Sequence, residues 1–219
     1  MRRELSEKEI LDTVRDIRHE APGIGAYKLY LMLKELYPDG MRGRDWFYGL
    51  MHESHLMLKP GKRRHTTSSN HPYRKYKNMI KGLTVNRINQ LWVADITYID
   101  TDEGVAYLHL LTDAFTHEII GWVLSDSLVA SNTVTALDMG ISHVSPLGFD
   151  GLIHHSDRGV QYCCNQYIDR LQAIKATISM TEDYKPTDNA IAERVNGIIK
   201  QEWLYRMKRP PDVVAARDL

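Results

Sequence analysis

The stretch LWVADITYIDTDEGVAYLHLLTDAFTHEIIGWVL, residues 91–124, predicts three antiparallel strands in succession. Apolar and β-branched residues dominate two runs, Leu91–Asp100 and Val105–Asp113, and a turn at Asp102–Gly104 joins them as a hairpin. A third strand is expected over His117–Leu124. These strands begin a sheet, and the rest of the predicted fold builds outward from them.

Downstream of this sheet, helical and strand patterns alternate along the chain. We expect helices over residues 131–144, 161–174 and 188–203, and strands over residues 152–155 and 177–180. Three antiparallel strands followed by alternating helices and parallel strands are the ribonuclease H-like order. The predicted fold class is therefore α/β, with a mixed sheet flanked by helices.

Three acidic residues stand out against these elements. Asp95 lies inside the first apolar run, where a charge must be paired or metal-bound. Asp157 follows a predicted strand, and strand ends are where α/β proteins place their sites. Glu193 lies on the last predicted helix, where it shares a face with Asn196 and Lys200. Such a set of oxygen ligands suits Mg²⁺ or Mn²⁺.

Two such ions about 4 Å apart can activate an attacking oxygen and stabilise the leaving oxygen of a phosphodiester. The three carboxylates therefore predict a two-metal enzyme that acts on nucleic acid. Other nearby polar residues have simpler interpretations. Asp113, at a strand end, is expected to be a hydrogen-bonded turn residue. Structural roles are favoured for His154 and His155, although alternation puts His155 on the same face as Asp157.

These motifs together resemble the bacterial insertion-sequence transposases of the second-reading-frame product type, whose catalytic core is related to retroviral integrases. The matching stretches cover roughly residues 89–202 and comprise residues 92–99, 107–113, 119–122, 155–159 and 188–190 with Glu193 and Lys200. The resemblance implies a ribonuclease H-like fold and a metal-binding Asp, Asp, Glu triad of Asp95, Asp157 and Glu193. It also implies that Lys200 matches a basic residue that contacts element-end DNA in the family.

The resemblance further implies metal-dependent cleavage of DNA at the ends of a mobile element, followed by strand transfer. Action as a multimer on paired element ends is implied too, often after fusion with an upstream helix-turn-helix protein. Two other readings stay open. One is a metal-dependent nuclease of the same fold that cuts without joining, and the other is a decayed transposase that only binds DNA.

Charge is divided unevenly along the chain. Residues 1–90 hold 18 Lys+Arg against 10 Asp+Glu, and residues 91–219 hold 10 against 18. No acidic residue occurs from Ser54 through Ala94. This run is either a solvated linker or a basic arm that follows DNA phosphates. Its candidates for phosphate contact are Lys62, Arg63, Arg64, Arg74 and Lys75.

The first sixty residues are predicted to form three short helices. A capping box at Ser6–Glu9 opens the first, Pro38–Gly40 ends the second, and the third spans about residues 44–55. Glycine-containing turns between them favour a helix-turn-helix module, although any small three-helix bundle has the same pattern. The residues expected to contact DNA here are Arg42 and Arg44, with Lys28 as a further candidate.

The predicted domain organisation has three parts. Residues 1–58 form the helical DNA-binding region, 59–88 the basic linker and 89–219 the integrase-like core. Only eight residues follow Pro211 where the family normally continues with another helix, so we expect a core truncated at its C-terminal end. Adjacent Cys163 and Cys164 are expected to be buried helix residues. No signal-peptide pattern or long apolar run occurs, and we expect a cytoplasmic, nucleoid-associated bacterial protein.

Overall fold

The computed structural model describes residues 5–58, 70–144, 148–182 and 190–219. The chain divides into two compact units. The first comprises Met1–Arg63 and Gly197–Lys208, and the second comprises Arg64–Asn196 and Arg209–Leu219. Among the described residues, no helix combines the length and the apolar character needed to cross a lipid bilayer.

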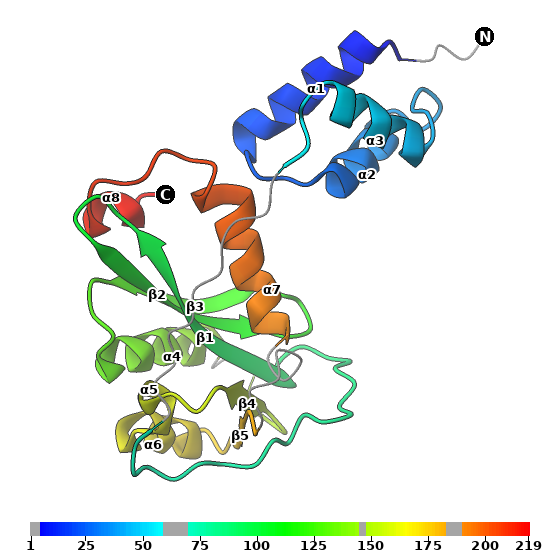
Figure 1. Ribbon diagram of the computed structural model, residues 1–219. Helices are drawn as coiled ribbons and strands as arrows, with labels where there is room; N and C mark the ends of the chain where they lie inside the picture. The colour runs from blue at the N-terminus through cyan, green and yellow to red at the C-terminus, as the bar shows by residue number, and fades with distance from the viewer. Residues whose placement is uncertain (1–4, 59–69, 145–147, 183–189) are drawn as a thin grey trace. The chain divides into compact units, whose positions relative to one another are not determined.

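The first unit contains the three predicted helices, α1 (Glu7–Glu20), α2 (Ala26–Leu36) and α3 (Arg44–Glu53) (Figure 1). The capping box is confirmed, because Ser6 Oγ accepts from the Glu9 backbone and the Glu9 carboxylate accepts from the Ser6 backbone. The three helices bury one apolar cluster. Its fully buried members are Ile10, Val14, Leu29, Leu33, Phe47 and Met51.

The end of the last long helix also belongs to the first unit. α7 (Ala190–Ile198) is followed directly by a π-helical segment, η3 (Ile199–Leu204), where a single α-helix was predicted. Glu202 in η3 accepts from Lys28 Nζ at 2.7 Å. Its backbone lies against Gly23, where an added Cβ would come within 1.9 Å of the Glu202 Cα. Only glycine permits this approach.

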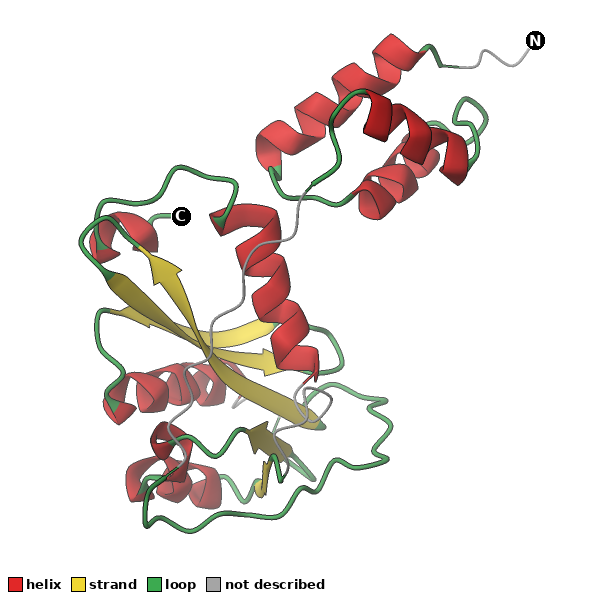
Figure 2. Cartoon of the chain, in the orientation of Figure 1, coloured by secondary structure: helices red, strands yellow, loops and turns green. Residues whose placement is uncertain are grey.

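The second unit contains a five-stranded sheet with the order β3-β2-β1-β4-β5 (Figure 2). β2 pairs antiparallel with both β1 and β3, while β4 pairs parallel with both β1 and β5. This order confirms the predicted ribonuclease H-like arrangement. The strands are β1 (Leu91–Asp100), β2 (Val105–Asp113), β3 (Ile119–Ser125), β4 (Ile153–Ser156) and β5 (Thr177–Met180).

Helices cover both faces of this sheet. α4 (Ala130–Val144), α5 (Val160–Cys163) and α6 (Asn165–Ala173) lie on one side, and α7 lies on the other (Figure 1). The larger core lies between the sheet and the first three of these helices, and includes Trp92, Ala94, Leu111, Leu137 and Leu171. Alternation along β1 explains the division, since Trp92 and Ala94 face this core while Leu91 and Val93 face α7.

One predicted helix is broken in two. Residues 161–174 were expected to be continuous, but Cys164 has φ −65° and ψ 149°, an extended conformation that ends α5 and caps α6. The two cysteines are nevertheless buried, with Cys163 2% and Cys164 9% exposed. Their apolar burial explains why the sequence shows an unbroken helical pattern across the break.

Residues 70–90, most of which lie in the predicted linker, are part of the second unit. Ile80, Leu83 and Val85 contact the apolar cluster of Leu91 and Val93 on the α7 face. The C-terminal residues also join this unit through α8 (Val213–Arg217). Arg217 donates to the Leu124 carbonyl, and the Pro210 and Pro211 carbonyls accept from the backbone of the β1–β2 turn.

Asp113 organises the turn between β2 and β3. Its carboxylate accepts from the backbone N–H groups of Asn89 at 2.8 Å, Phe115 at 2.9 Å and Thr116 at 2.9 Å. The residue is 1% exposed. It is a hydrogen-bonded turn aspartate, as predicted, and it joins the entry of β1 to the exit of β2.

Replacing Asp113 with Ala should lower the free energy of unfolding by about 3 kcal/mol, because buried backbone donors lose a charged acceptor. The matched control is Asp102→Ala at the exposed hairpin tip, which should change it by less than about 0.5 kcal/mol. Urea unfolding measures both. Equal effects of the two substitutions would contradict the organising role of Asp113.

His154 makes stability depend on pH. Burial, followed by the neighbouring His155, lowers the pKa of His154 from 6.5 to about 3. The unfolded state therefore binds a proton more readily, and stability falls as pH drops from 6.5 toward 3. The expected loss is about 2 kcal/mol between pH 6.5 and pH 5. His154→Gln should reduce the dependence of the unfolding free energy on pH, measured by urea unfolding across that range. An unchanged pH dependence in this variant would show that His154 is not its cause.

The control for this experiment is His143→Gln. The His143 side chain is 57% exposed and pairs with Glu118 at 3.6 Å. Its removal should leave the pH slope of unfolding close to that of the wild type.

Candidate active site

Asp95 and Asp157 are brought together by the pairing of their strands. In the parallel ladder, Leu91 to Val93 pair with Ile153 to His155 in an unbroken register. Continuing that register by two residues sets Asp95 opposite Asp157, which immediately follows β4. Neighbouring strands lie about 4.8 Å apart, and paired residues of parallel strands point to the same face. Carried past its last pair, Val93 with His155, this register places Asp95 and Asp157 at neighbouring positions.

The electrostatics of Tyr162 are consistent with this placement. Tyr162 is 2% exposed and lies at the start of the helical region after Asp157. Its pKa is raised well above 10, by burial first and then by the negative charges of Asp95 and Asp157. Both carboxylates thus act on one buried phenol.

The loop after β4 holds Asp157 from its own backbone. The Gly159 N–H donates to Asp157 Oδ1 at 2.8 Å. An added Cβ on Gly159 would lie 2.9 Å from that oxygen and 3.1 Å from Gln161 Oε1. A larger residue at this position would therefore push against the Asp157 and Gln161 side chains. Asp157 also raises the pKa of Cys163 to about 11, together with burial, which is the larger cause.

α7 supplies the contact to Asp95. Asn196, 8% exposed, donates its side-chain amide to Asp95 Oδ2, while Ile191 packs against Leu91 and Val93. The sequence placed Asn196 on the face of Glu193 but did not predict its role. The signal available was its spacing of three residues from Glu193.

Glu193 lies one helical turn before Asn196 and is exposed. Within the described parts of the chain, no three or more His, Cys, Asp or Glu side chains are grouped closely enough to hold a metal ion. Asp95 and Asp157 both act on Tyr162, and Glu193 is exposed on α7, the helix whose Asn196 contacts Asp95. Two half-buried, adjacent carboxylates still have the chemistry that hard divalent cations prefer, so this pair fits such a group.

The residues next to Asp157 have structural partners. His155 is fully buried and its Nδ1 lies 2.8 Å from Ser179 Oγ. His154 Nε2 lies 2.9 Å from the Tyr167 hydroxyl on α6. The predicted structural role of both histidines is confirmed, and His155 is on the face that carries Asp157.

The predicted DNA contacts lie in different parts of the chain. Lys200 lies in η3, which belongs to the first unit. The prediction that Lys200 shares a helix face with Glu193 assumed 3.6 residues per turn, and the π-helical geometry of η3 departs from that value. Arg42 stacks on the Trp46 ring at 4.6 Å, and Arg44 pairs with Asp45 at 3.2 Å. Lys28 is paired with Glu202 within the first unit, and its side chain is 44% exposed.

The basic run is described only in part. Arg74 and Lys75 are exposed, and the Arg74 guanidinium lies 4.9 Å from the centroid of the Tyr76 ring. Lys62, Arg63 and Arg64 lie outside the described residues.

Two family models match the chain, and both are described as integrase core domains. One matches residues 85–186, and the other matches residues 174–219. Together they extend from the residues before β1 to the end of the chain. Asp95 and Asp157 lie within the first match, and Glu193 and Lys200 lie within the second.

Several curated relatives are transposases of insertion sequences. The transposase for insertion sequence element IS904 of Lactococcus lactis is 32% identical over 210 residues, covering 90% of this chain and 78% of that protein. A putative IS986/IS6110 transposase of Mycobacterium tuberculosis is 36% identical over 53% of this chain, and the IS629 transposase of Shigella sonnei is 33% identical over 67%. The chain spans about half the length of these two relatives, 43% and 48% respectively.

Solved structures with a similar arrangement include the HTLV-2 integrase catalytic core domain in complex with magnesium. It is 21% identical with a TM-score of 0.41, covering 52% of this chain and 68% of that chain. The catalytic domain of Mos1 mariner transposase is 11% identical with a TM-score of 0.45, covering 59% and 67%.

Replacing Asn196 with Asp should destabilise the second unit at neutral pH, because it sets a second carboxylate against Asp95. We expect a loss of about 2 kcal/mol at pH 7 that shrinks toward pH 4, where one carboxyl takes up a proton and donates to the other. Thermal unfolding at the two pH values measures this difference.

The control is Asn165→Asp at the exposed start of α6. An added negative charge at a helix N-terminus is neutral or slightly stabilising, so this variant should match the wild type. A pH-independent loss for Asn196→Asp would argue against its contact with Asp95.

Proposed function

This chain belongs to the insertion-sequence transposases that carry an integrase core domain, and we propose that it catalyses metal-dependent DNA strand cleavage and strand transfer at the ends of a mobile element. The observation that carries the proposal is the parallel register of β1 and β4, which, continued two residues past the pair of Val93 with His155, would put Asp95 opposite Asp157. Phosphodiester chemistry needs closely spaced carboxylates of this kind, and a purely DNA-binding protein does not.

We infer that Asp95, Asp157 and Glu193 are the catalytic triad and would hold two Mg²⁺ or Mn²⁺ ions. When bound, the ions supply Lewis acidity for the attacking and leaving oxygens of the phosphodiester. Asn196 and the Gly159 N–H orient the two aspartates. Hydrogen bonds of this type favour the ionised carboxylate, which is the form that binds a cation.

The proposal requires Glu193 to join the pair on the same helix that already touches Asp95. Ile191 and Asn196 hold α7 against the sheet on either side of Glu193. A change of side-chain rotamer or a small rotation of α7 then moves its carboxylate relative to the pair without rebuilding the core. Cation binding supplies the attraction for that movement.

The proposed partner is double-stranded DNA, both element ends and target, bound by a homo-oligomer. The helical region and the basic run before β1 support it, since residues 1–90 carry a net charge of +8. The residues proposed to contact phosphate are Arg42, Arg44, Lys62, Arg63, Arg64, Arg74, Lys75 and Lys200.

Replacing Asp95 or Asp157 with Asn, or Glu193 with Gln, should reduce Mg²⁺- or Mn²⁺-dependent nicking and joining by at least about 1000-fold. Each change removes a ligand charge while keeping side-chain volume. The assay uses labelled DNA that carries the ends of the native element, with the full 219-residue chain.

The control is Asp138→Asn on α4, where the carboxylate pairs with Arg170 at 3.0 Å and is 45% exposed. It should retain wild-type activity. Metal-dependent cutting without joining by the wild type would favour a nuclease of the same fold. Tight binding with neither reaction would favour a protein that only binds DNA.

A further inference from the structure

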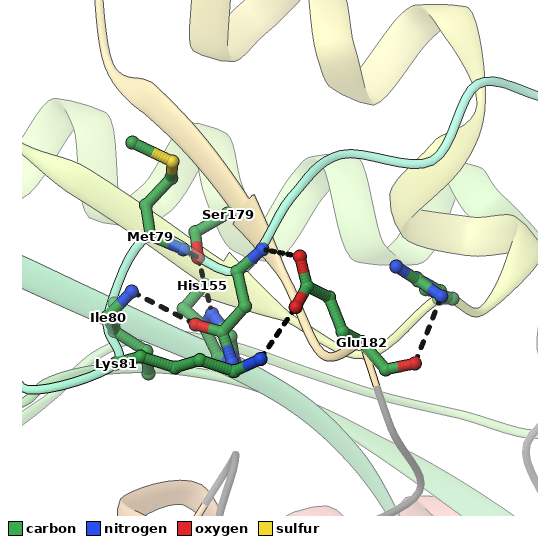
Figure 3. A network of polar contacts seen from close by, with 8 residues as sticks. Met79, Ile80, Lys81, His155, Ser179 and Glu182 are labelled. Atoms are coloured by element: carbon green, nitrogen blue, oxygen red, sulfur yellow. Dashed lines mark hydrogen bonds and ion pairs between the residues drawn. The ribbon is translucent and has the colours of Figure 1, made fainter.

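Residues 77–81, here called the strap, run along β5 at the edge of the sheet (Figure 3). The Met180 N–H donates to the Lys77 carbonyl at 3.3 Å, and the Met79 N–H donates to Ser179 Oγ at 2.8 Å. An edge strand exposes a row of backbone groups that need partners. The strap is therefore hydrogen-bonded to this edge of the sheet and is not a free linker.

An inner path leads from the strap to His155. Ser179 and His155 are both fully buried, and Ser179 Oγ lies 2.8 Å from the Met79 nitrogen and 2.8 Å from His155 Nδ1. A backbone N–H can only donate, so Ser179 Oγ accepts from Met79. The same oxygen shares a hydrogen bond with His155 Nδ1, whose direction depends on the imidazole tautomer.

An outer path leads from the strap to Arg158 through Glu182. The two carboxylate oxygens of Glu182 accept from the Asn78 N–H at 3.1 Å and from Lys81 Nζ at 2.6 Å. The backbone carbonyl of the same residue accepts from Arg158 Nη1 at 3.1 Å. Figure 3 shows the Glu182 carboxylate directed toward Lys81 of the strap.

Both paths end beside the same aspartate. His155 lies two residues before Asp157, and Arg158 directly follows it. The backbone that carries the Asp157 carboxylate is therefore anchored to the strap on both sides. Lys81 is 57% and Glu182 33% exposed at the side chain, and exposed pairs of this kind contribute little to global stability.

We propose that Ser179 and Glu182 are positioning residues for strand transfer, an inference that rests on the proposed function. Through their contacts with the strap, and through His155 and Arg158, they fix the carboxylate of Asp157. Neither side chain touches the reacting atoms. The strap is thereby part of the active-site support and not only a connection to the helical region. Partners that orient metal-binding side chains typically affect metal affinity or activity by about 10–100-fold.

The first test measures the Mn²⁺ requirement of the full chain. Ser179→Ala and Glu182→Ala should each raise the Mn²⁺ concentration for half-maximal nicking by about tenfold. They should also reduce the rise in melting temperature that Mn²⁺ alone produces. Glu182→Gln keeps an acceptor for Asn78 and loses the charge facing Lys81, so its effect should be intermediate.

The matched control is Asp138→Ala, which removes a similarly exposed ion pair with Arg170, on the opposite face of the sheet. It should leave the Mn²⁺ requirement and the Mn²⁺-induced shift unchanged. The proposal is overturned if Asp138→Ala raises the Mn²⁺ concentration for half-maximal nicking as much as Glu182→Ala does. It is also overturned if neither Ser179→Ala nor Glu182→Ala raises that concentration.

The second test follows the Gly159 amide by hydrogen exchange, because this amide donates to Asp157 Oδ1. Loosening of Asp157 in Ser179→Ala or Glu182→Gln should speed Gly159 exchange by about tenfold, and for Glu182→Gln the change in melting temperature should be no larger than that of Asp138→Ala. Unchanged Gly159 exchange in both variants would refute the positioning role. A wild type that exchanges as expected but neither cuts nor joins DNA would refute the proposed function alone.

Discussion

Three paired positions, from Leu91 with Ile153 to Val93 with His155, determine where β1 and β4 stand relative to each other. A slip of one residue would turn every side chain of β4 to the opposite face and move Asp157 away from Asp95. Burial prevents this slip. Leu91, Val93 and Ile153 are covered on one face, whereas Trp92 faces the larger core on the other. The buried apolar residues thus determine the relative positions of Asp95 and Asp157, although they do not contact the two carboxylates.

Asp95 and Asp157 follow the apolar residues of β1 and β4 that pack on the α7 face. Burying an ionised group without partners is costly, and each aspartate here has a nearby donor: Asn196 for Asp95 and Gly159 for Asp157. Burial first, and then the two negative charges, raise the pKa of the neighbouring Tyr162. A divalent cation would relieve that concentration of negative charge, which links the fold to the proposed chemistry.

Local patterns predicted most of the fold because strands and helices bury one face each. Alternation located β1 and β2, and the short β5 was predicted over its observed residues 177–180. Contacts between distant residues were not predictable in this way. The break at Cys164 keeps helical burial on both sides, and the π-helical segment lies where Glu202 docks on Gly23. Both depend on tertiary packing that the sequence pattern does not encode.

The strap shows how one charge pattern can serve two purposes. The basic residues of this part of the chain suggested a linker, but Ile80 in the strap and Leu83 and Val85 just after it are partly buried against the α7-face cluster. These apolar residues were the available signal of packing. Lys81 is committed to Glu182 within the protein. Arg74 and Lys75, by contrast, extend from exposed positions just before the strap. The basic run therefore divides into a part that supports the candidate site and a part that faces solvent, where phosphate contact is compatible with the fold.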